Sequence, residues 1–592
     1  MKERFFTRKT DRTRNHTEEE MRTRRTARGE DTVPRDGLEE IDLMDETDMD
    51  GMDMDQIDTD ETDMNRTDTE RTDMDMDRMN TDTGRKSTGS RPTRKGQTAG
   101  TGKAGVKVRE VRLENDTPDP VDGGSRNTEL GIVTYTFIFL FLLMVGYLVY
   151  LNVWKADDLN SNAYNTKQDF NEDRYIRGSI VSADGQILAE TQVGEDGTET
   201  RVYPYANVFS HVVGYSSNGK SGLEALCNND LLSSNTSILT QIRDENEAQK
   251  SRGDSVVVTL NANLQVAAYQ ALGSYNGAVV AIEPDTGKIL AMVSKPDFDP
   301  NHIEELWDSL ISDSSSSVLL NRATQGLYPP GSTFKILTTL AYIRQEPLSY
   351  RNFSFDCTSQ LTQNDVTIHC YNNAVHGQED LKSAFAHSCN TAFAQIGLDL
   401  DAGDFASLCE EFLFNDSLPT ELQHSTSQFV LNDQSSYGEQ MTTAIGQGDT
   451  LVTPLHMALL TSTVANGGIM MRPYLIDHIQ AYDGNRVSEN SPSRYQRLMT
   501  AEEARILTEY MQETVNSGTA TALGGYGYSV AGKTGSAEYV SDGYEGTHSW
   551  FVGFSNVEDP DLVVAVIAED GGTGSETAVP IAAQVFQAYY NS

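Results

Sequence analysis

A serine and a lysine stand three residues apart in the segment Tyr328-Pro-Pro-Gly-Ser-Thr-Phe-Lys335. The Pro-Pro-Gly break predicts that Ser332 begins a helix, where free backbone N–H groups and the helix dipole favour developing negative charge. Positions i and i+3 share a helix face, so Lys335 can reach the Ser332 hydroxyl, and burial would lower its pKa enough for it to act as a base. The pair predicts serine nucleophilic catalysis. The spacing alone is not specific, because Ser217 and Lys220 share it in a segment typical of a turn.

A second candidate motif, Ser388-Cys389-Asn390, stands directly before an apolar run. The Ser388 hydroxyl could relay a proton, and the Asn390 amide could hold a substrate carbonyl. The alternative for Ser388 is a helix N-cap, a common place for serine. Ser-x-Asn also occurs at Ser216 and Ser488, so this motif is informative only in combination with the other motifs.

A third candidate, Lys533-Thr534-Gly535-Ser536, interrupts a strand pattern. A lysine, two hydroxyls and a glycine pack poorly inside a sheet. They suit an edge strand that binds a carboxylate and lets a peptide backbone approach closely. The alternative is an ordinary edge strand protected by its lysine.

The elements around these motifs predict an α+β domain. The run 277–294 is typical of two strands joined by a Pro-Asp-Thr-Gly turn, and 528–540, 548–556 and 562–570 indicate three more strands. An amphipathic helix is expected over 575–590, and the middle, 332–511, looks mostly helical. Two early strands, a helical insert and three late strands predict one five-stranded antiparallel sheet flanked by helices.

The N-terminal part divides by composition. Residues 1–130 alternate basic and acidic blocks without apolar periodicity, which predicts a disordered tail, and these offsetting charges give no indication of nucleic-acid binding. Residues 131–153 carry no charge and suit a membrane-spanning helix. Ten Lys and Arg residues lie between Arg85 and Arg126 before it, and acidic residues follow, so the positive-inside rule predicts a cytoplasmic tail and an outer remainder. Residues 154–252 are expected to form a small α+β module, with a helix near 242–250.

The chain has five cysteines, and their positions do not decide between a disulfide and reduced thiols. Cys357 and Cys370 flank a predicted hairpin that a disulfide could pin, and two reduced thiols fit as well. Cys227, Cys389 and Cys409 lack metal-ligand spacing. We therefore expect neither a metal nor a cofactor.

In chain order, Ser-x-x-Lys, Ser-x-Asn and Lys-Thr-Gly are similar to the signature of penicillin-binding proteins and serine β-lactamases. YPPGSTFK, HSWFVGF and GQGDTLVTPLHMALLTSTVANGG resemble the transpeptidase domain of high-molecular-weight penicillin-binding proteins. RYIRGSIVSADGQILAET, YPYANVFSHVVGY and SGLEALCNNDL resemble the N-terminal module of the class B, monofunctional group. The resemblance implies a penicillin-binding domain over 253–592 and a pedestal or dimerisation-like module over 154–252. Cys at 389, and Ser at 536 where many relatives carry Thr, keep the required groups.

The resemblance also implies roles. Ser332 would be acylated and Lys335 would accept its proton, while Ser388 would shuttle protons and Asn390 would orient the donor peptide. The residues around the substrate carboxylate would be Lys533, Thr534, Gly535 and Ser536. The backbone N–H groups of Ser332 and Ser536 would form the oxyanion hole.

The implied function is a peptidoglycan D,D-transpeptidase that cross-links stem peptides outside a bacterial cytoplasmic membrane and is acylated by β-lactam antibiotics. A multi-spanning lipid II polymerase is the implied partner, while partners of the tail stay unknown. The alternatives are a D,D-carboxypeptidase or β-lactamase-like hydrolase, a catalytically weak scaffold and a penicillin sensor. A bifunctional enzyme is disfavoured, because only about 120 residues separate the apolar helix from the first hairpin, without a glycosyltransferase motif.

Overall fold

The computed structural model describes residues 124–154, 174–237, 240, 243, 250–312, 317–541 and 544–591. Nearly all of the predicted disordered tail, and most of the helix expected over 242–250, lie outside the described residues.

The apolar helix α1 runs over Gly124–Trp154. Its segment Leu130–Tyr150 is long and apolar enough to cross a membrane, and none of it is buried. The hydroxyls of Thr134 and Thr136 each donate 2.8 Å back to the carbonyl four residues earlier. These two hydroxyls are thus satisfied within the helix, as a lipid environment would require.

The main sheet has the five antiparallel strands that the sequence predicts. Its order is β17-β18-β19-β7-β8, so the early hairpin lies beside the last of the three late strands. β17 is an edge strand that pairs only with β18, over its full length. The strands are β7 (Gly277–Ile282), β8 (Ile289–Lys295), β17 (Val530–Ser541), β18 (Tyr544–Ser555) and β19 (Leu562–Ala568).

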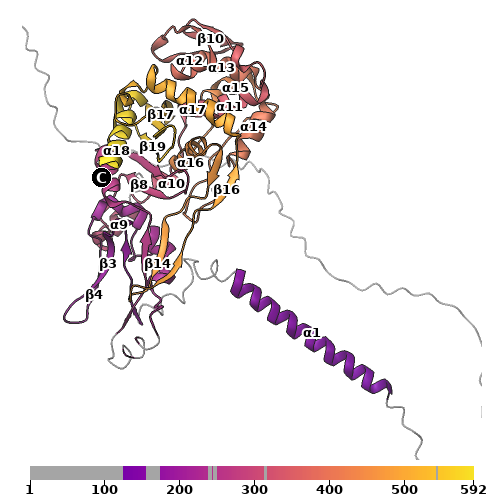
Figure 1. The fold of residues 1–592 in the computed structure, drawn as a ribbon, viewed down its shortest axis with the longest axis vertical. Coiled ribbons are helices and arrows are strands. Elements are labelled where there is room, and N and C mark those ends of the chain that lie inside the picture. The colour runs from indigo at the N-terminus through magenta and orange to yellow at the C-terminus, as the bar shows by residue number, and fades with distance from the viewer. Residues whose placement is uncertain are drawn as a thin grey trace, which may run out of the picture. The chain divides into compact units, whose positions relative to one another are not determined.

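Both faces of this sheet are covered (Figure 1). Alternate residues of β19 enter two separate apolar cores: Val563 and Ile567 belong to one, Val564 and Val566 to the other. Burial on both faces explains why the central strands are continuous apolar runs rather than alternating patterns. One face packs on α16 (Pro454–Ala465), and the other on α8 (Ala262–Leu272) and α18 (Val579–Asn591).

The middle of the chain is less helical than the sequence predicts. It contains eight short strands besides its helices, and their three to five residues are too few and too polar for a clear period of two. The hairpin expected between Cys357 and Cys370 is present as β10 and β11. The strands are β9 (Phe355–Cys357), β10 (Gln360–Gln363), β11 (Val366–His369), β12 (Gly377–Glu379), β13 (Ile469–Met471), β14 (Ile476–Gln480), β15 (Arg486–Glu489) and β16 (Arg494–Arg497).

The helices of the middle segment are α11 (Lys335–Gln345), α12 (Leu381–Ala386), α13 (Asn390–Asp399), α14 (Ala402–Glu411), α15 (Tyr437–Ala444), α16 and α17 (Ala501–Asn516). Several of them pack on α11, which contacts α13, α14 and α17.

The N-terminal module contains a second sheet, with strand order β15-β14-β6-β2-β3-β4. Because β6 pairs with both β2 and β14, this sheet takes strands from both sides of residue 252. The domain boundary predicted there stays a prediction. In this sheet the strands before residue 252 are β2 (Ile180–Val181), β3 (Ile187–Val193) and β4 (Glu199–Val202), and β6 (Ser255–Val258) follows it.

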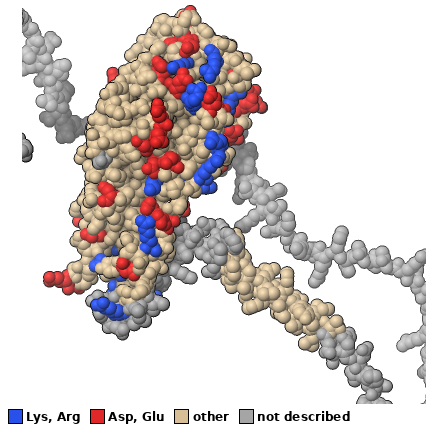
Figure 2. Space-filling model, in the orientation of Figure 1, with Lys and Arg blue, Asp and Glu red and all other residues tan. Residues whose placement is uncertain are grey.

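Breaking a charged pair in the interior of the globular part costs more stability than breaking a charged pair on its surface. Figure 2 shows acidic and basic side chains interspersed over one face, and exposed pairs of this kind contribute little each. Inside the N-terminal module, by contrast, the fully buried Glu224 accepts from Arg177 Nε at 2.6 Å and from Arg201 Nε at 2.7 Å. Burial raises the pKa of Glu224, but the two arginines outweigh it and hold the pKa below its ordinary value.

Glu224→Gln should therefore destabilise the protein by about 3–5 kcal/mol, because it leaves two buried guanidinium groups without their counter-charge. Denaturant unfolding of the detergent-solubilised protein measures this, with Glu195→Gln, an exposed carboxylate in the same module, as the control. Equal unfolding midpoints for the two variants would contradict the importance assigned to the buried cluster.

Candidate active site

Ser332 lies in a single 3-10 turn, η3 (Gly331–Phe334), immediately before α11, as the sequence predicts. The turn is held from two sides. Gly331 has a φ of 53° and donates its N–H to the carbonyl of Gly446 at 2.8 Å. Trp550 Nε1 donates 3.0 Å to the carbonyl of Pro329. The nucleophile candidate is therefore carried by a rigid turn.

Lys335 is completely buried, and this burial lowers the pKa of its amine to about 8. Its Nζ donates to the Ser388 carbonyl and to Asn390 Oδ1, each at 2.8 Å, and to Ser388 Oγ at 3.3 Å. Among the described contacts none joins Lys335 Nζ to Ser332 Oγ. The cation is directed to the oxygens of the second motif, and catalytic hydrogen bonds often tighten only when substrate is bound.

Ser388 lies in the turn between α12 and α13 and has a φ of 57°, which is unusual for serine. It is not the helix N-cap: that position is Cys389, whose sulfur accepts from the Ala392 N–H at 3.5 Å. Holding a non-glycine residue in the left-handed region costs roughly 1 kcal/mol or more, a strain that tends to occur at functional sites.

Lys533 is the second fully buried lysine of the site. Burial and the nearby charge of Lys335 lower its pKa well below the ordinary value. Its Nζ donates 3.0 Å to Ser388 Oγ and 3.0 Å to the carbonyl of Thr534. Two lysines thus share one hydroxyl, and an arriving carboxylate would favour the charged form of Lys533.

Gly535 allows β17 to pack directly on the turn that carries Ser332. A Cβ at this position would lie 3.0 Å from Trp550 Cβ and 3.1 Å from both the Pro330 carbonyl oxygen and Thr333 Cγ2. The sequence argument assigned this glycine to the approach of a substrate backbone. In the structure, the close neighbour is the protein's own turn.

Gly535→Ala should push β17 away from the Ser332 turn, slow acylation at least about tenfold and destabilise the fold by about 1–3 kcal/mol, because the site is tightly packed. The matched control is Gly527→Ala, where an added Cβ meets nothing within 4 Å. Stopped-flow acylation rates and unfolding midpoints measure both effects. Similar rates for the two variants would show that this contact does not position the strand.

All three motifs line one cavity of about 660 Å³. It brings together Ser332, Ser388, Asn390, Thr534 and Ser536. Asn390 Nδ2 donates 3.0 Å to the His369 carbonyl, which orients its amide, and Ser536 Oγ accepts from the Gly574 N–H at 3.2 Å. A hydroxyl, two depressed-pKa amines and an edge strand around one cavity can support acyl transfer to serine.

Several cavity residues were not found from the sequence. The Thr519 and Thr534 hydroxyls lie 2.5 Å apart, and Gln447 also lines the cavity. Thr519 comes from a loop without a recognisable motif, whereas Gln447 lies in the stretch GQGDTLVTPLHMALLTSTVANGG, to which the sequence argument assigned no site residue. Beside Cys389, the side chains of Cys357, Cys370 and His376 form a cluster of potential metal ligands.

Comparison with known proteins identifies the family of the chain. Residues 277–587 match the penicillin binding protein transpeptidase domain, and 177–256 match the penicillin binding protein A dimerisation domain. The chain is 33% identical over 489 residues to the peptidoglycan D,D-transpeptidase PbpA of Mycolicibacterium smegmatis, covering 77% of this chain and 97% of that one. Its identity to PbpA of Mycobacterium tuberculosis is 34% over 492 residues, covering 78% and 99%.

Solved structures give the same result. Penicillin-binding protein A from M. tuberculosis, as a ceftriaxone acyl-enzyme complex, matches with a TM-score of 0.65 and 31% identity, covering 71% of this chain and 99% of that one. A D,D-transpeptidase domain from Eggerthella lenta matches with a TM-score of 0.64 and 33% identity, covering 71% and 99%. The chain belongs to the penicillin-binding protein transpeptidase family. Its two matched domains place it among the class B, PbpA-like, serine-type peptidoglycan D,D-transpeptidases. Enzymes of this class are acylated by β-lactams, as the ceftriaxone complex shows. The predicted family, fold and activity are confirmed.

Proposed function

We propose that this chain cross-links peptidoglycan stem peptides through an acyl-enzyme on Ser332. The observation that carries the proposal is the meeting of all three motifs in one cavity, with two buried lysines around the Ser388 hydroxyl. Neither lysine has a carboxylate partner among the hydrogen bonds of the described residues, so each amine loses its proton more readily than an ordinary lysine and can then accept one.

In the acylation step, Ser332 Oγ attacks the carbonyl carbon of the penultimate D-alanine while the neutral amine of Lys335 accepts the hydroxyl proton. The peptide C–N bond breaks, and the leaving D-alanine amine takes a proton through Ser388, which contacts both lysines. The backbone N–H groups of Ser332 and Ser536 stabilise the oxyanion, a contribution often worth about 3 kcal/mol or more.

The donor peptide is positioned by the remaining residues. Lys533 and Thr534 hold its terminal carboxylate, whose charge favours protonation of Lys533. Asn390 holds a backbone amide of the donor, because its own amide is already oriented by Lys335 and His369. In the second step, the acceptor amine attacks the ester carbon and gives a proton to Lys335, and Ser332 leaves with a proton returned to its oxygen.

A transpeptidase is distinguished from a hydrolase by the fate of the acyl group. With a donor peptide ending in D-Ala-D-Ala and an acceptor amine, we expect cross-linked product to rise with acceptor concentration at the expense of hydrolysed donor. A long-lived penicillin adduct is expected in the same preparation. Hydrolysis that is insensitive to the acceptor, or rapid penicillin turnover, would instead establish the carboxypeptidase or β-lactamase alternative.

The apolar helix and the basic residues before it support a single-pass anchor with a cytoplasmic N-terminus and an outer catalytic domain. A multi-spanning lipid II polymerase beside α1 would supply the glycan chains. Protease added to intact spheroplasts should digest residues 174–591 and spare an epitope tag at the N-terminus. Loss of the tag with survival of the catalytic domain would reverse the topology.

A further inference from the structure

The loop 445–448, which follows α15, packs on the turn that carries Ser332. Gly331 donates its N–H to the carbonyl of Gly446 at 2.8 Å. Gly446 has a φ of 77°, and a Cβ at this position would lie 1.9 Å from the Gly331 carbonyl oxygen. Because the two backbones are in direct contact, the position of the next residue, Gln447, is fixed relative to the nucleophile turn.

The side chain of Gln447 binds the outer backbone of β17. With its amide oriented to satisfy both partners, the nitrogen donates 3.0 Å to the Glu538 carbonyl and the oxygen accepts from the Glu538 N–H at 3.1 Å. One side chain thus makes the two hydrogen bonds that a residue of a neighbouring antiparallel strand would make. Gln447 is half-buried and lines the cavity together with Ser332 and Ser536.

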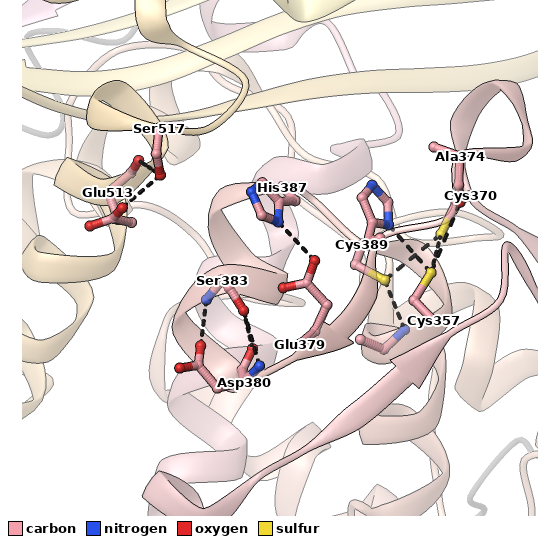
Figure 3. A network of polar contacts seen from close by, with 12 residues as sticks. Cys357, Cys370, Ala374, Glu379, Asp380, Ser383, His387, Cys389, Glu513 and Ser517 are labelled. Carbon is pink, nitrogen blue, oxygen red and sulfur yellow. Dashed lines mark hydrogen bonds and ion pairs between the residues drawn. The ribbon is translucent and has the colours of Figure 1, made fainter.

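The strand β17 depends on such support because it has a sheet neighbour, β18, on one side only. The Ser388 side of the cavity is held by its own contacts, which Figure 3 shows. Glu379 Oε1 lies 2.7 Å from His387 Nδ1, and Asp380 caps α12 by accepting from the Ser383 N–H at 2.7 Å. Of the two sides of the cavity, the edge strand is therefore the less constrained.

The contact with Gln447 also identifies which backbone groups of β17 face the cavity. Because the N–H and C=O of successive residues in a strand point to opposite edges, Thr534 and Ser536 present theirs on the same edge as Glu538. The Thr534 carbonyl accepts from Lys533 Nζ at 3.0 Å. Lys533 and Gln447 thus occupy outward groups on either side of Ser536. The stretch of edge with which a substrate backbone can pair is centred on Ser536.

We propose that Gln447 is a positioning residue that holds β17 at the nucleophile turn and limits main-chain pairing of the donor peptide to Ser536. The proposal rests on the proposed function, in which the N–H groups of Ser332 and Ser536 bind the oxyanion and Lys533 holds the donor carboxylate. A donor in that direction is antiparallel to β17. Its reacting D-alanine then pairs with Ser536, and the residue two positions earlier would meet Glu538.

At Glu538 both outward groups are already bound by the Gln447 amide, so the donor chain must turn away from the sheet there. The enzyme then reads the two terminal residues of a donor through main-chain hydrogen bonds. Earlier residues of the stem peptide, including their branches, are not selected by pairing with β17. Gln447 in this way sets both the geometry of the oxyanion hole and the length of donor that the edge strand recognises.

The positioning role is tested with Gln447→Met in the full-length protein in detergent, since methionine keeps the length of the side chain and removes both hydrogen bonds. Stopped-flow acylation at several penicillin concentrations should show a limiting rate about ten- to a hundredfold lower, because a displacement of about 1 Å near the reacting atoms has an effect of this size. The Kd of the non-covalent complex should stay within about threefold. The control is Gln434→Met, an exposed glutamine before α15, which should match wild type. A wild-type rate in Gln447→Met would overturn the proposal.

Gln447→Glu distinguishes these hydrogen bonds from a general packing role. The variant keeps the shape of the side chain and the acceptor, but a carboxylate cannot donate to the Glu538 carbonyl, whereas the protonated acid can. Its acylation rate divided by the wild-type rate at the same pH should therefore rise several-fold from pH 8 to pH 5. Taking the ratio removes the effect of the other titratable groups of the site, which both proteins share: Lys335, Lys533, Glu538, His369, His376 and His387. A ratio that stays constant over this range would contradict the proposal.

The limit on pairing is tested on the wild-type protein with donor peptides that carry one N-methyl group. Methylation of the penultimate D-alanine should slow acylation at least about tenfold, because it removes the N–H that pairs with Ser536. Methylation two residues earlier should change the rate less than about twofold. Equal losses at the two positions would show that the donor continues along β17 to Glu538, and the proposed limit would be wrong.

This series keeps the proposal testable if a variant does not fold, which melting temperatures would reveal. Failure of the proposed function has a different result, namely wild-type protein that forms no penicillin adduct on Ser332. A normal adduct on Ser332 at an unchanged rate in Gln447→Met would leave the acyl-enzyme in place and remove only the role of Gln447.

Discussion

Ser332→Ala abolishes covalent penicillin labelling and peptide cross-linking, while the melting temperature stays within a degree or two of wild type. The reason is that the acyl group has no other oxygen to bond: Ser388 is the nearest hydroxyl of the second motif, but it is bound by both lysines. Loss of a serine nucleophile removes about 10⁴-fold or more of the rate in enzymes of this kind. Gel fluorescence with a labelled penicillin and a cross-linking assay measure both losses.

The matched control is Ser217→Ala. Ser217 has the same spacing to a lysine, but it lies in a loop of the N-terminal module. Its labelling should equal that of wild type. A Ser332→Ala protein that still carried the drug covalently would show that the first motif is not the acylation site.

Lys335→Met lowers the acylation rate by about 10²–10⁴-fold, because it removes the proposed proton acceptor and keeps the volume of a buried side chain. Substrate affinity should change far less, since the residues proposed to hold the carboxylate are Lys533 and Thr534. Without the neighbouring charge of Lys335, the pKa of Lys533 should also move up toward its ordinary value. Stopped-flow acylation at several penicillin concentrations separates the rate from the affinity.

The pH dependence of the acylation rate tests whether Lys335 is the base. Burial lowers the pKa of Lys335 to about 8, and only the neutral amine accepts a proton. Wild-type acylation should therefore rise about tenfold per pH unit below pH 7 and level off above about pH 8. In Lys335→Met this limb should disappear. A wild-type rate that is independent of pH between 6 and 8, or a limb that survives in the variant, would exclude Lys335 as the base.

The sequence predicts the catalytic sheet well because its signals are local. The hairpin 277–294 and the three late strands are long apolar runs with turns between them, and burial on both faces makes such runs conspicuous. The three motifs are equally local, since each has its chemistry within four residues. Their meeting in one cavity follows from the order of strands, in which β17 lies at the edge beside the turn that carries Ser332.

The parts of the fold and of the site that the sequence does not predict depend on contacts between segments that lie far apart in the chain. β14 joins the N-terminal sheet from more than two hundred residues away, and its five residues alone do not reveal the pairing. Gly535 shows a different limit: a glycine in an edge strand indicates a close approach, but the sequence cannot say that the partner is Pro330 and Thr333. The cluster around Cys389 assembles only through the β9–β12 segment, so spacing alone argued against it.

The most direct test of the account is to label the purified wild-type protein with a penicillin, digest it and locate the adduct by mass spectrometry. The account predicts one modified residue, Ser332, at a stoichiometry of about one per chain. A modified Ser388 or Ser536, or an adduct outside the cavity, would contradict it.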